Sequence, residues 1–456
     1  MLVALGVALL AAAAALDLFV YGARPPATTP TAPLTTAPLT TAPIPPPFAI
    51  ASLEAPAPGP YSARVVWTTT APSRGQLQWG PAGMRHVLWS SEPAPSAEHT
   101  VTLDGLTANT TYAVEVAASS ADGARAARSF EFRTAAAPTS VTASIEQATV
   151  RVNGGSFFPL IAWFQCADRW PASIAEGIDL FGGNGCTSLA SLATGVAGQA
   201  LAAGTSDDPP VEAPSLLGWF YPDEADARGL TGATMPATPS GLRFLTLTAH
   251  FFAGAAPLPS GRSMYPGLVS RADVVGFDLY PLQELCRRDF LAAVFDAQQA
   301  LTALAPGKPT FQWIEARELK CPTVPVTPAT VRAESWLALA GGAHGLGFFP
   351  QDWDPAIGAA IGGVTARIRQ LEPALLEPAR PLRLESSSPD VRASERRWHD
   401  ARYVVAVNAG TTAASIRVPG PRPPIALAGS ATRLPPLGVG IYVFPPDPYQ
   451  VRGRPR

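Results

Sequence analysis

The sequence carries little charge and no excess of either sign. Charged residues make up 15% of the chain, and the formal net charge at pH 7 is −2. Binding to nucleic acid needs a field of positive charge, so we expect no nucleic-acid partner. Hydrophobic residues, at 47%, are numerous enough for a large core. A chain of 456 residues predicts about three domains.

Metal ligands are also scarce. The chain has five histidines and four cysteines, and no two cysteines have the Cys-x-x-Cys spacing of a zinc or redox site. We therefore expect neither a metal ion nor an organic cofactor. In an exported protein the cysteines would form two disulfides. Of the three possible pairings, we favour the sequence neighbours, Cys166 with Cys186 and Cys286 with Cys321.

The N-terminal region points to export. Residues 2–21 are almost continuously apolar, which suits either a secretory signal peptide or a membrane anchor within residues 1–23. Residues 24–47 are rich in threonine and proline and cannot bury a core, so they predict an extended linker. The folded part is then secreted, or tethered through this linker to a membrane or cell wall, outside the cytoplasm.

Residues 48–136 read as short antiparallel strands, for example 63–69 and 111–116, and predict a small β-sandwich. This segment resembles a fibronectin type III domain. Trp67 matches the early-strand core tryptophan of that family, residues 106–112 resemble its tyrosine corner, and residues 130–134 resemble its last strand. Related sandwiches precede the catalytic domain of purple acid phosphatases, but the chain lacks the Gly-Asn-His-Glu motif and the histidines that those dinuclear sites need.

Residues 150–376 alternate between strand and helix patterns, with helices expected at 289–304, at 330–340 and up to about 376. Eight strands in this rhythm favour a (β/α)₈ TIM barrel. An open doubly wound sheet is the alternative, but no glycine-rich phosphate loop follows the first strand. The expected strands cover residues 158–164, 177–181, 194–201, 216–221, 242–250, 273–280, 310–314 and 345–349.

Strand patterns return in residues 377–447. Proline and glycine bound the expected strands, which cover residues 381–385, 401–408, 414–418 and 439–444. A C-terminal β-sandwich packed on the barrel accounts for this pattern. The fold class is therefore multidomain: a fibronectin type III-like β-sandwich, a TIM barrel and a C-terminal β-sandwich.

Two apolar runs of the barrel end on carboxylates. Residues 218–224 read Gly-Trp-Phe-Tyr-Pro-Asp-Glu, and residues 309–315 end on Glu315. Each reads as a buried strand that delivers an acid to its carboxyl end, where the active sites of such barrels lie. The structural alternative is that Asp223 and Glu224 cap the next helix, because acids suit a helix N-terminus.

Acids after the fourth and seventh strands resemble the arrangement of clan A glycoside hydrolases. Residues 273–281 resemble the sixth strand of bacterial members, and residues 345–353 resemble an eighth strand that ends near a tryptophan. The resemblance implies a retaining glycoside hydrolase of oligo- or polysaccharides, with Glu224 as acid/base and Glu315 as nucleophile, about 5 Å apart. The alternative function is a catalytically inactive carbohydrate-binding or cell-surface protein on the same barrel.

Other residues near the expected strand ends are candidates for binding substrate. Asp223 stands where the clan usually has an asparagine that bonds the sugar 2-hydroxyl, and an aspartate can accept that bond but cannot donate one. The tryptophans have the apolar face on which sugars stack, although large aromatics near a barrel rim are often core. The full set of candidates is Asp223, Trp163, Gln165, His250, Asp278, Tyr280 and Trp353.

Overall fold

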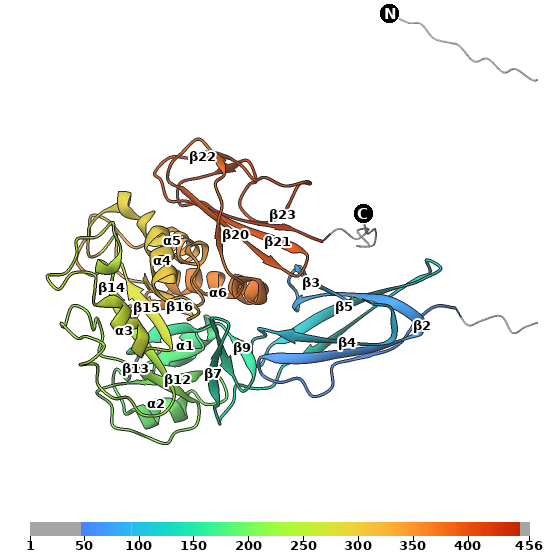
Figure 1. The fold of residues 1–456 in the computed structure, drawn as a ribbon, viewed down its shortest axis with the longest axis horizontal. Helices are drawn as coiled ribbons and strands as arrows, with labels where there is room; N and C mark the ends of the chain where they lie inside the picture. The colour runs from blue at the N-terminus through green and yellow to red at the C-terminus, as the bar shows by residue number, and fades with distance from the viewer. Residues whose placement is uncertain (1–46, 93, 447–456) are drawn as a thin grey trace, which may run out of the picture. The chain divides into compact units, whose positions relative to one another are not determined.

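The structure is a computed structural model that describes residues 47–92 and 94–446. The expected signal peptide or anchor, and all of the expected linker except Pro47, lie outside the described residues. Within the described part of the chain, no helix is long and apolar enough to cross a membrane. Figure 1 shows antiparallel strands in blue, then the strands and helices of a barrel in green to orange, then further antiparallel strands in red.

The first part is a six-stranded antiparallel sheet. The antiparallel strands agree with the alternating pattern of the sequence, whereas the β-sandwich stays a prediction. The long strand β2 organises it, because β2 pairs with β4 along its first half and with β5 along its second half. Trp67 on β2 is buried, and the hydroxyl of Tyr112 accepts a hydrogen bond from the backbone N–H of Thr107 at 2.9 Å. The strands are β1 (Ile50–Glu54), β2 (Ser62–Pro81), β3 (Leu88–Ser91), β4 (Ser96–Asp104), β5 (Thr111–Ser120) and β6 (Arg125–Arg133).

A small sheet that the sequence did not reveal leads into the barrel. It consists of β7 (Ala143–Glu146), β8 (Thr149–Val152) and β9 (Gly155–Phe157). Its buried side chains, such as Phe157, share a core with the barrel strands. Asp104, at the end of β4, accepts hydrogen bonds from the backbone N–H and the hydroxyl of Ser156, both at 2.8 Å. This sheet therefore ties the first part of the chain to the barrel.

Eight parallel strands close into a barrel, which confirms the predicted architecture. Each strand pairs with the next in sequence, and the last returns to the first, with Leu160 beside Leu346. The strands are β10 (Leu160–Trp163), β11 (Leu180–Gly182), β12 (Leu201–Thr205), β13 (Leu216–Phe220), β14 (Leu242–Thr248), β15 (Val274–Asp278), β16 (Thr310–Glu315) and β17 (Leu346–Phe349).

Helices follow most of the barrel strands, but the connections from β12 to β13 and from β13 to β14 contain none. Two single 3₁₀ turns, η1 (Ala249–Phe251) and η2 (Arg288–Phe290), lie in the loops after β14 and β15. The helices are α1 (Trp170–Ala175), α2 (Leu189–Gly195), α3 (Tyr265–Arg271), α4 (Ala293–Leu304), α5 (Pro328–Gly341) and α6 (Pro355–Leu375).

The predicted third strand was misplaced. Its expected start, at residues 194–195, lies in α2, and the strand itself begins only at Leu201. Ser188 caps α2 by accepting a hydrogen bond from the N–H of Ser191, and the buried residues Leu189, Leu192 and Ala193 have helical spacing. The capped helix therefore takes residues that an apolar run alone had assigned to a strand.

Bulky aromatic side chains fill the barrel, and glycines on neighbouring strands make room for them. A Cβ atom at Gly182 would lie 2.7 Å from the Trp163 ring, and one at Gly347 would lie 2.1 Å from the Trp313 ring. Real Cβ atoms do not approach so closely, so these two positions need glycine. The interior is a packed core, as in other barrels of this type.

The C-terminal part forms two antiparallel sheets, ordered β18-β20-β21-β25-β23 and β19-β22-β24. The predicted strand at 381–385 was wrong, because the chain leaves one sheet after Pro381 and enters the other at Glu385. β20 escaped prediction because it carries four charged side chains. The strands are β18 (Arg380–Pro381), β19 (Glu385–Ser386), β20 (Val391–Trp398), β21 (Ala401–Asn408), β22 (Ala414–Arg417), β23 (Ile425–Ala428), β24 (Arg433–Leu434) and β25 (Val439–Phe444).

Candidate active site

Glu224 lies in a turn just beyond β13, at the carboxyl end of the barrel strands. Its φ of 49° places it in the left-handed region, which is costly for a residue with a side chain and is often found at functional sites. The buried carboxylate of Asp226 anchors this turn. It accepts hydrogen bonds from the N–H of Thr248 at 2.9 Å and from the hydroxyl of Tyr265 at 3.0 Å. The rest of the fold therefore holds Glu224 in its strained conformation.

The carboxyl groups of Glu224 and Asp278 face each other closely enough to share a proton. Two carboxyl groups can form a hydrogen bond only if one of them is protonated. Asp278 keeps part of its surface in contact with solvent, but the protein around it is dense enough that desolvation, and then the charge of Glu224, raises its pKa well above the usual value. Of the two acids, Asp278 therefore holds its proton more tightly.

Further acids surround this pair. Burial and then the negative charge of Asp223 raise the pKa of Glu224, and Glu284 adds to the effect. Glu284 is exposed in the segment after β15, and its charge also raises the pKa of Asp278. Four carboxyl groups therefore act on one another at this end of the barrel, and their mutual repulsion favours the protonated form of Asp278 and Glu224.

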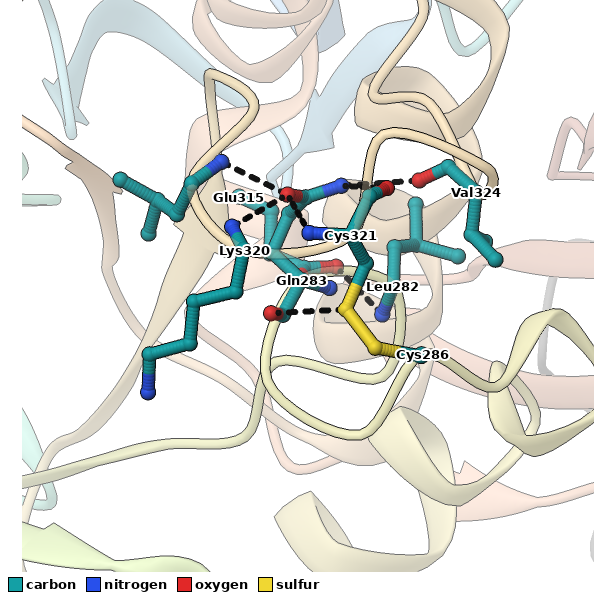
Figure 2. Close-up of a disulfide and its surroundings, with 8 residues drawn as sticks. Leu282, Gln283, Cys286, Glu315, Lys320, Cys321 and Val324 are labelled. Carbon is teal, nitrogen blue, oxygen red and sulfur yellow. Dashed lines mark hydrogen bonds between the residues drawn. A yellow bond between two sulfur atoms is a disulfide. The ribbon is translucent and has the colours of Figure 1, made fainter.

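Glu315, the last residue of β16, is 2% exposed, and the backbone after β15 holds its carboxylate (Figure 2). Its Oε1 accepts a hydrogen bond from the N–H of Gln283 at 2.7 Å, and its Oε2 accepts one from the N–H of Leu282 at 3.2 Å. Burial raises the pKa of Glu315 to about 7, although these N–H groups favour its charged form.

The side chain of Gln283 joins the two loops beside Glu315 (Figure 2). Its Nε2 donates to the carbonyl of Val324 at 2.8 Å, and its Oε1 accepts from the N–H groups of Leu319, Lys320 and Cys321. The disulfide Cys286–Cys321 links the same two loops. Cys166–Cys186 is the other disulfide, so both predicted pairings are confirmed.

A second buried acid meets Glu315 from α5. Oε1 of Glu334 accepts a hydrogen bond from the N–H of Glu315 at 3.3 Å, and the two carboxyl groups lie close enough to share a proton. Burial, and then the charge of Glu315, raises the pKa of Glu334 well above its usual range. A pair of interacting carboxyl groups therefore lies at each of two strand ends, Glu224 with Asp278 beyond β13 and Glu315 with Glu334 at the end of β16.

Aromatic residues lie at the same end of the barrel. Trp163 is 8% exposed and packs edge-to-face on Phe220 and Trp313, with ring centroids 4.8 and 5.5 Å away. Tyr280 stacks on Phe349 at 5.7 Å and remains partly exposed. Tyr280 therefore presents more surface to a ligand than Trp163 does.

Gln165, two residues beyond β10, is 2% exposed, and neither atom of its amide has a hydrogen-bond partner among the described residues. An unpaired buried amide is unfavourable, since it has lost its contacts with water. Phe164 beside it is 37% exposed and has a φ of 53°. The end of the first barrel strand therefore combines an unsatisfied polar group with backbone strain.

Three predicted residues remain, and two of them, His250 and Trp353, have hydrogen-bond partners within the protein. Nδ1 of His250, in the loop after β14, donates to the carbonyl of Ala256 at 2.6 Å. Trp353 is 4% exposed, and its Nε1 donates to Glu176 at 2.8 Å, which leaves little of its ring surface for a sugar. Asp223 is exposed beside Glu224.

Sequence reasoning missed Gln283, Glu284 and Glu334. Glu334 carried a usable signal, because it lies at helical spacing from Val331, Ala338 and Gly341, so that a charged residue interrupts the buried stripe of α5. Gln283 and Glu284 lie in a loop, where no periodicity marks a buried or interacting side chain. Among the described residues, no group of three or more His, Cys, Asp or Glu side chains is arranged to hold a metal ion.

Comparisons with known proteins give only distant likenesses. No protein-family model matches the chain, and no curated protein matches its sequence. Solved structures of β-glucuronidase from Ruminococcus gnavus are similar over 70% of this chain and 68% of theirs. The enzyme in complex with D-glucaro 1,5-lactone has 9% identity and a TM-score of 0.37, and its apo structure has 10% identity and a TM-score of 0.36. Scores this low do not establish a shared fold, so the barrel assignment rests on the strand pairing.

Proposed function

We propose that this protein is a retaining glycoside hydrolase that acts on an oligo- or polysaccharide outside the cytoplasm, with Glu224 as acid/base and Glu315 as nucleophile. The observation that carries this proposal is the placement of two acids at the carboxyl end of the closed barrel, with Glu224 in the turn just beyond β13 and Glu315 as the last residue of β16. Cleavage of a glycosidic bond needs an acid that still holds a proton at working pH. Burial, and then the negative charge of Asp223, raise the pKa of Glu224 and so favour its protonated form.

In this mechanism Glu224 gives its proton to the leaving oxygen while the bond from that oxygen to the anomeric carbon breaks. A carboxylate oxygen of Glu315 forms the new bond to the anomeric carbon, and water, deprotonated by Glu224, later hydrolyses the resulting ester. The N–H groups of Leu282 and Gln283 use one lone pair on each oxygen of Glu315. Even when Glu334 also donates to the carboxylate, one oxygen of Glu315 keeps a lone pair with which it can react.

The other parts of the chain fit an extracellular enzyme with accessory modules. We propose that residues 48–136 form a fibronectin type III-like domain, which the bond from Thr107 to the Tyr112 hydroxyl supports as a tyrosine corner. Residues 377–447 would form a C-terminal β-sandwich. Two disulfides support an oxidising compartment, consistent with secretion or tethering through the N-terminal segment.

A specific observation favours the second candidate, an inactive carbohydrate-binding protein. Glu315 is buried, and both of its oxygens already accept hydrogen bonds. For the second candidate, the role of this carboxylate would be purely structural: it would fix the loops around it. A barrel mouth with Tyr280 and Gln165 would then hold a sugar without cleaving it.

The experiment is a hydrolysis screen of the purified full chain against aryl glycosides and polysaccharides, with a parallel binding assay. Glu224→Gln and Glu315→Gln should each lose activity, while Asp289→Asn, an exposed acid paired with Arg287, should keep it. Removing the acid costs roughly 10² to 10⁴-fold, and this loss should shrink with nitrophenolate leaving groups, which need no proton. Binding of a sugar without hydrolysis would favour the second candidate, and variants as active as the wild type would refute the assignment.

A further inference from the structure

Glu334 is a buried acid that the proposed mechanism does not use. It lies on α5, which begins after Thr327, where the threonine hydroxyl accepts the N–H of Thr330 and Pro328 takes the first helical position. Most of this helix is buried, and Glu334 is completely so. Burying a carboxyl group costs several kcal/mol unless it is neutral or well paired. The position of Glu334 therefore needs a specific explanation.

The two oxygens of Glu334 have different surroundings. Oε1 accepts the backbone N–H of Glu315 at 3.3 Å, whereas Oε2 is buried and receives no hydrogen bond from any donor group among the described residues. The group that Glu334 meets is the carboxyl of Glu315, whose own oxygens face the N–H donors of Leu282 and Gln283. Those donors stabilise a negative charge on Glu315, so the proton that the two acids share belongs on Glu334.

We infer that Glu334 is a positioning residue: as a neutral acid it donates its Oε2–H to the carboxylate of Glu315 and accepts the Glu315 N–H, so that a helix outside the barrel fixes both the direction and the charge of the acid at the end of β16. The contact geometry stands by itself, whereas its meaning for catalysis rests on the proposed function. In that function, Glu334 keeps the nucleophile ionised and prevents it from turning away from the sugar.

The charged and titratable groups that face Glu315 can be named for each element packed against it. Glu334 approaches from α5, and Glu284 approaches from the segment after β15. Tyr280 lies close enough that the charge of Glu315 helps to raise its pKa, after the larger effect of burial and the charges of Asp278 and Asp223. All of these neighbours are acids or a phenol, so the neutral form of Glu334 avoids a third negative charge around Glu315.

The test reads the two carboxyl groups directly, without relying on activity. The full chain is labelled with ¹³C at the glutamate carboxyl carbons, and NMR titration follows Glu315 and Glu334, which are assigned by the signals lost in Glu315→Gln and Glu334→Gln. We expect Glu315 to ionise first and Glu334 to stay protonated well above that pH. Ionisation of Glu334 in the ordinary range for a carboxyl group, below Glu315, would overturn the inference.

Two variants sharpen the result. Glu334→Gln keeps a donor and an acceptor, so the pKa of Glu315 should stay near the wild-type value. Glu334→Leu removes the donor, and the pKa of Glu315 should rise by about one to two units, since a hydrogen bond to a charged group is worth that much. An unchanged pKa in Glu334→Leu would contradict the positioning role; if this variant does not fold, the wild-type and Glu334→Gln titrations decide. A protein without hydrolase activity would leave this readout intact, so the two proposals fail separately.

Discussion

The carboxyl groups of Asp278 and Glu224 interact directly although their strands, β15 and β13, are not neighbours. β14 lies between them in the barrel, so the contact exists only because side chains converge at the carboxyl end of the closed sheet. The pKa of Asp278 is raised well above its usual range, so we expect the pair to keep one proton after Glu224 has ionised. In the proposed mechanism, Asp278 would be able to pass that proton to Glu224.

The first prediction concerns this reserve proton. In Asp278→Asn the amide can still donate to Glu224, but it has no acid proton to pass on. As the pH rises, Glu224 should then stop acting as an acid at a lower pH than in the wild type. The alkaline limb of the pH profile of kcat/KM should therefore move to lower pH. Asp289→Asn is the matched control and should leave the limb in place. An unmoved limb in Asp278→Asn would show that Asp278 holds no functional proton.

The second prediction concerns stability and the buried acid Glu334. Its pKa in the folded protein is raised above the ordinary 4.5, so the folded state binds this proton more tightly than the unfolded state does. The free energy of unfolding should therefore fall as pH rises above about 4.5, by roughly 1.4 kcal/mol per pH unit while the proton stays bound.

Glu334→Gln removes this proton and keeps both hydrogen bonds. Compared with the wild type, the variant should gain relative stability between pH 4.5 and 8, and the difference should be constant below pH 4. Urea unfolding followed at pH 4, 6 and 8 measures it. Parallel pH dependence in the two proteins would mean that Glu334 is ionised in the folded state.

The third prediction separates the two disulfides. Each closes a loop of similar length, with sequence separations of 20 and 35, so removing either should cost about 3 kcal/mol in the chain-entropy model. Only Cys286–Cys321 joins the loops that hold Glu315. The pair Cys286→Ser and Cys321→Ser should therefore lower kcat/KM well below that of Cys166→Ser with Cys186→Ser, measured at a temperature where both proteins are folded. Equal losses would argue that Glu315 does not depend on these loops.

The fourth prediction concerns the charge of the substrate. Asp223, Glu224, Asp278 and Glu284 act on one another at the mouth, and a uronic acid would bring another negative charge to them. Like charges about 5 Å apart at an effective dielectric constant near 20 repel strongly enough to weaken binding roughly tenfold or more. Each neutral aryl glycoside should therefore be a better substrate than the matching uronide, and Glu284→Gln should narrow the gap. A preference for uronides would show that other groups offset the negative charge of these four acids.

The sequence predicted the barrel because its strands are buried runs of β-branched, leucine and aromatic residues, and it predicted the two disulfides from their spacing. It misplaced the third strand, since small residues such as those at 194–200 suit helix, loop and strand alike. The sheet of β7 to β9 and the strand β20 were missed for a related reason. Their strands are short or carry charged residues, and only tertiary pairing stabilises them.

At the site, sequence patterns located the residues but not their partners. Glu224, Asp278 and Glu315 each lie at the end of an apolar run, and this pattern is visible in the sequence. The interaction of Asp278 with Glu224, and that of Glu334 with Glu315, depend on which strand ends and which helix meet after the barrel closes. Those contacts join residues 54 and 19 positions apart, and no local periodicity encodes such a distance.

The left-handed backbone of Glu224 sets activity against thermal stability at a single residue. Glycine adopts this conformation without cost, and asparagine does so more easily than glutamate. Replacing Glu224 by either should make the protein harder to unfold while it removes the acid. Selection for heat resistance alone would therefore remove this glutamate. A protein that keeps Glu224 is less stable than its glycine or asparagine variant, and this cost is accepted for the function of Glu224.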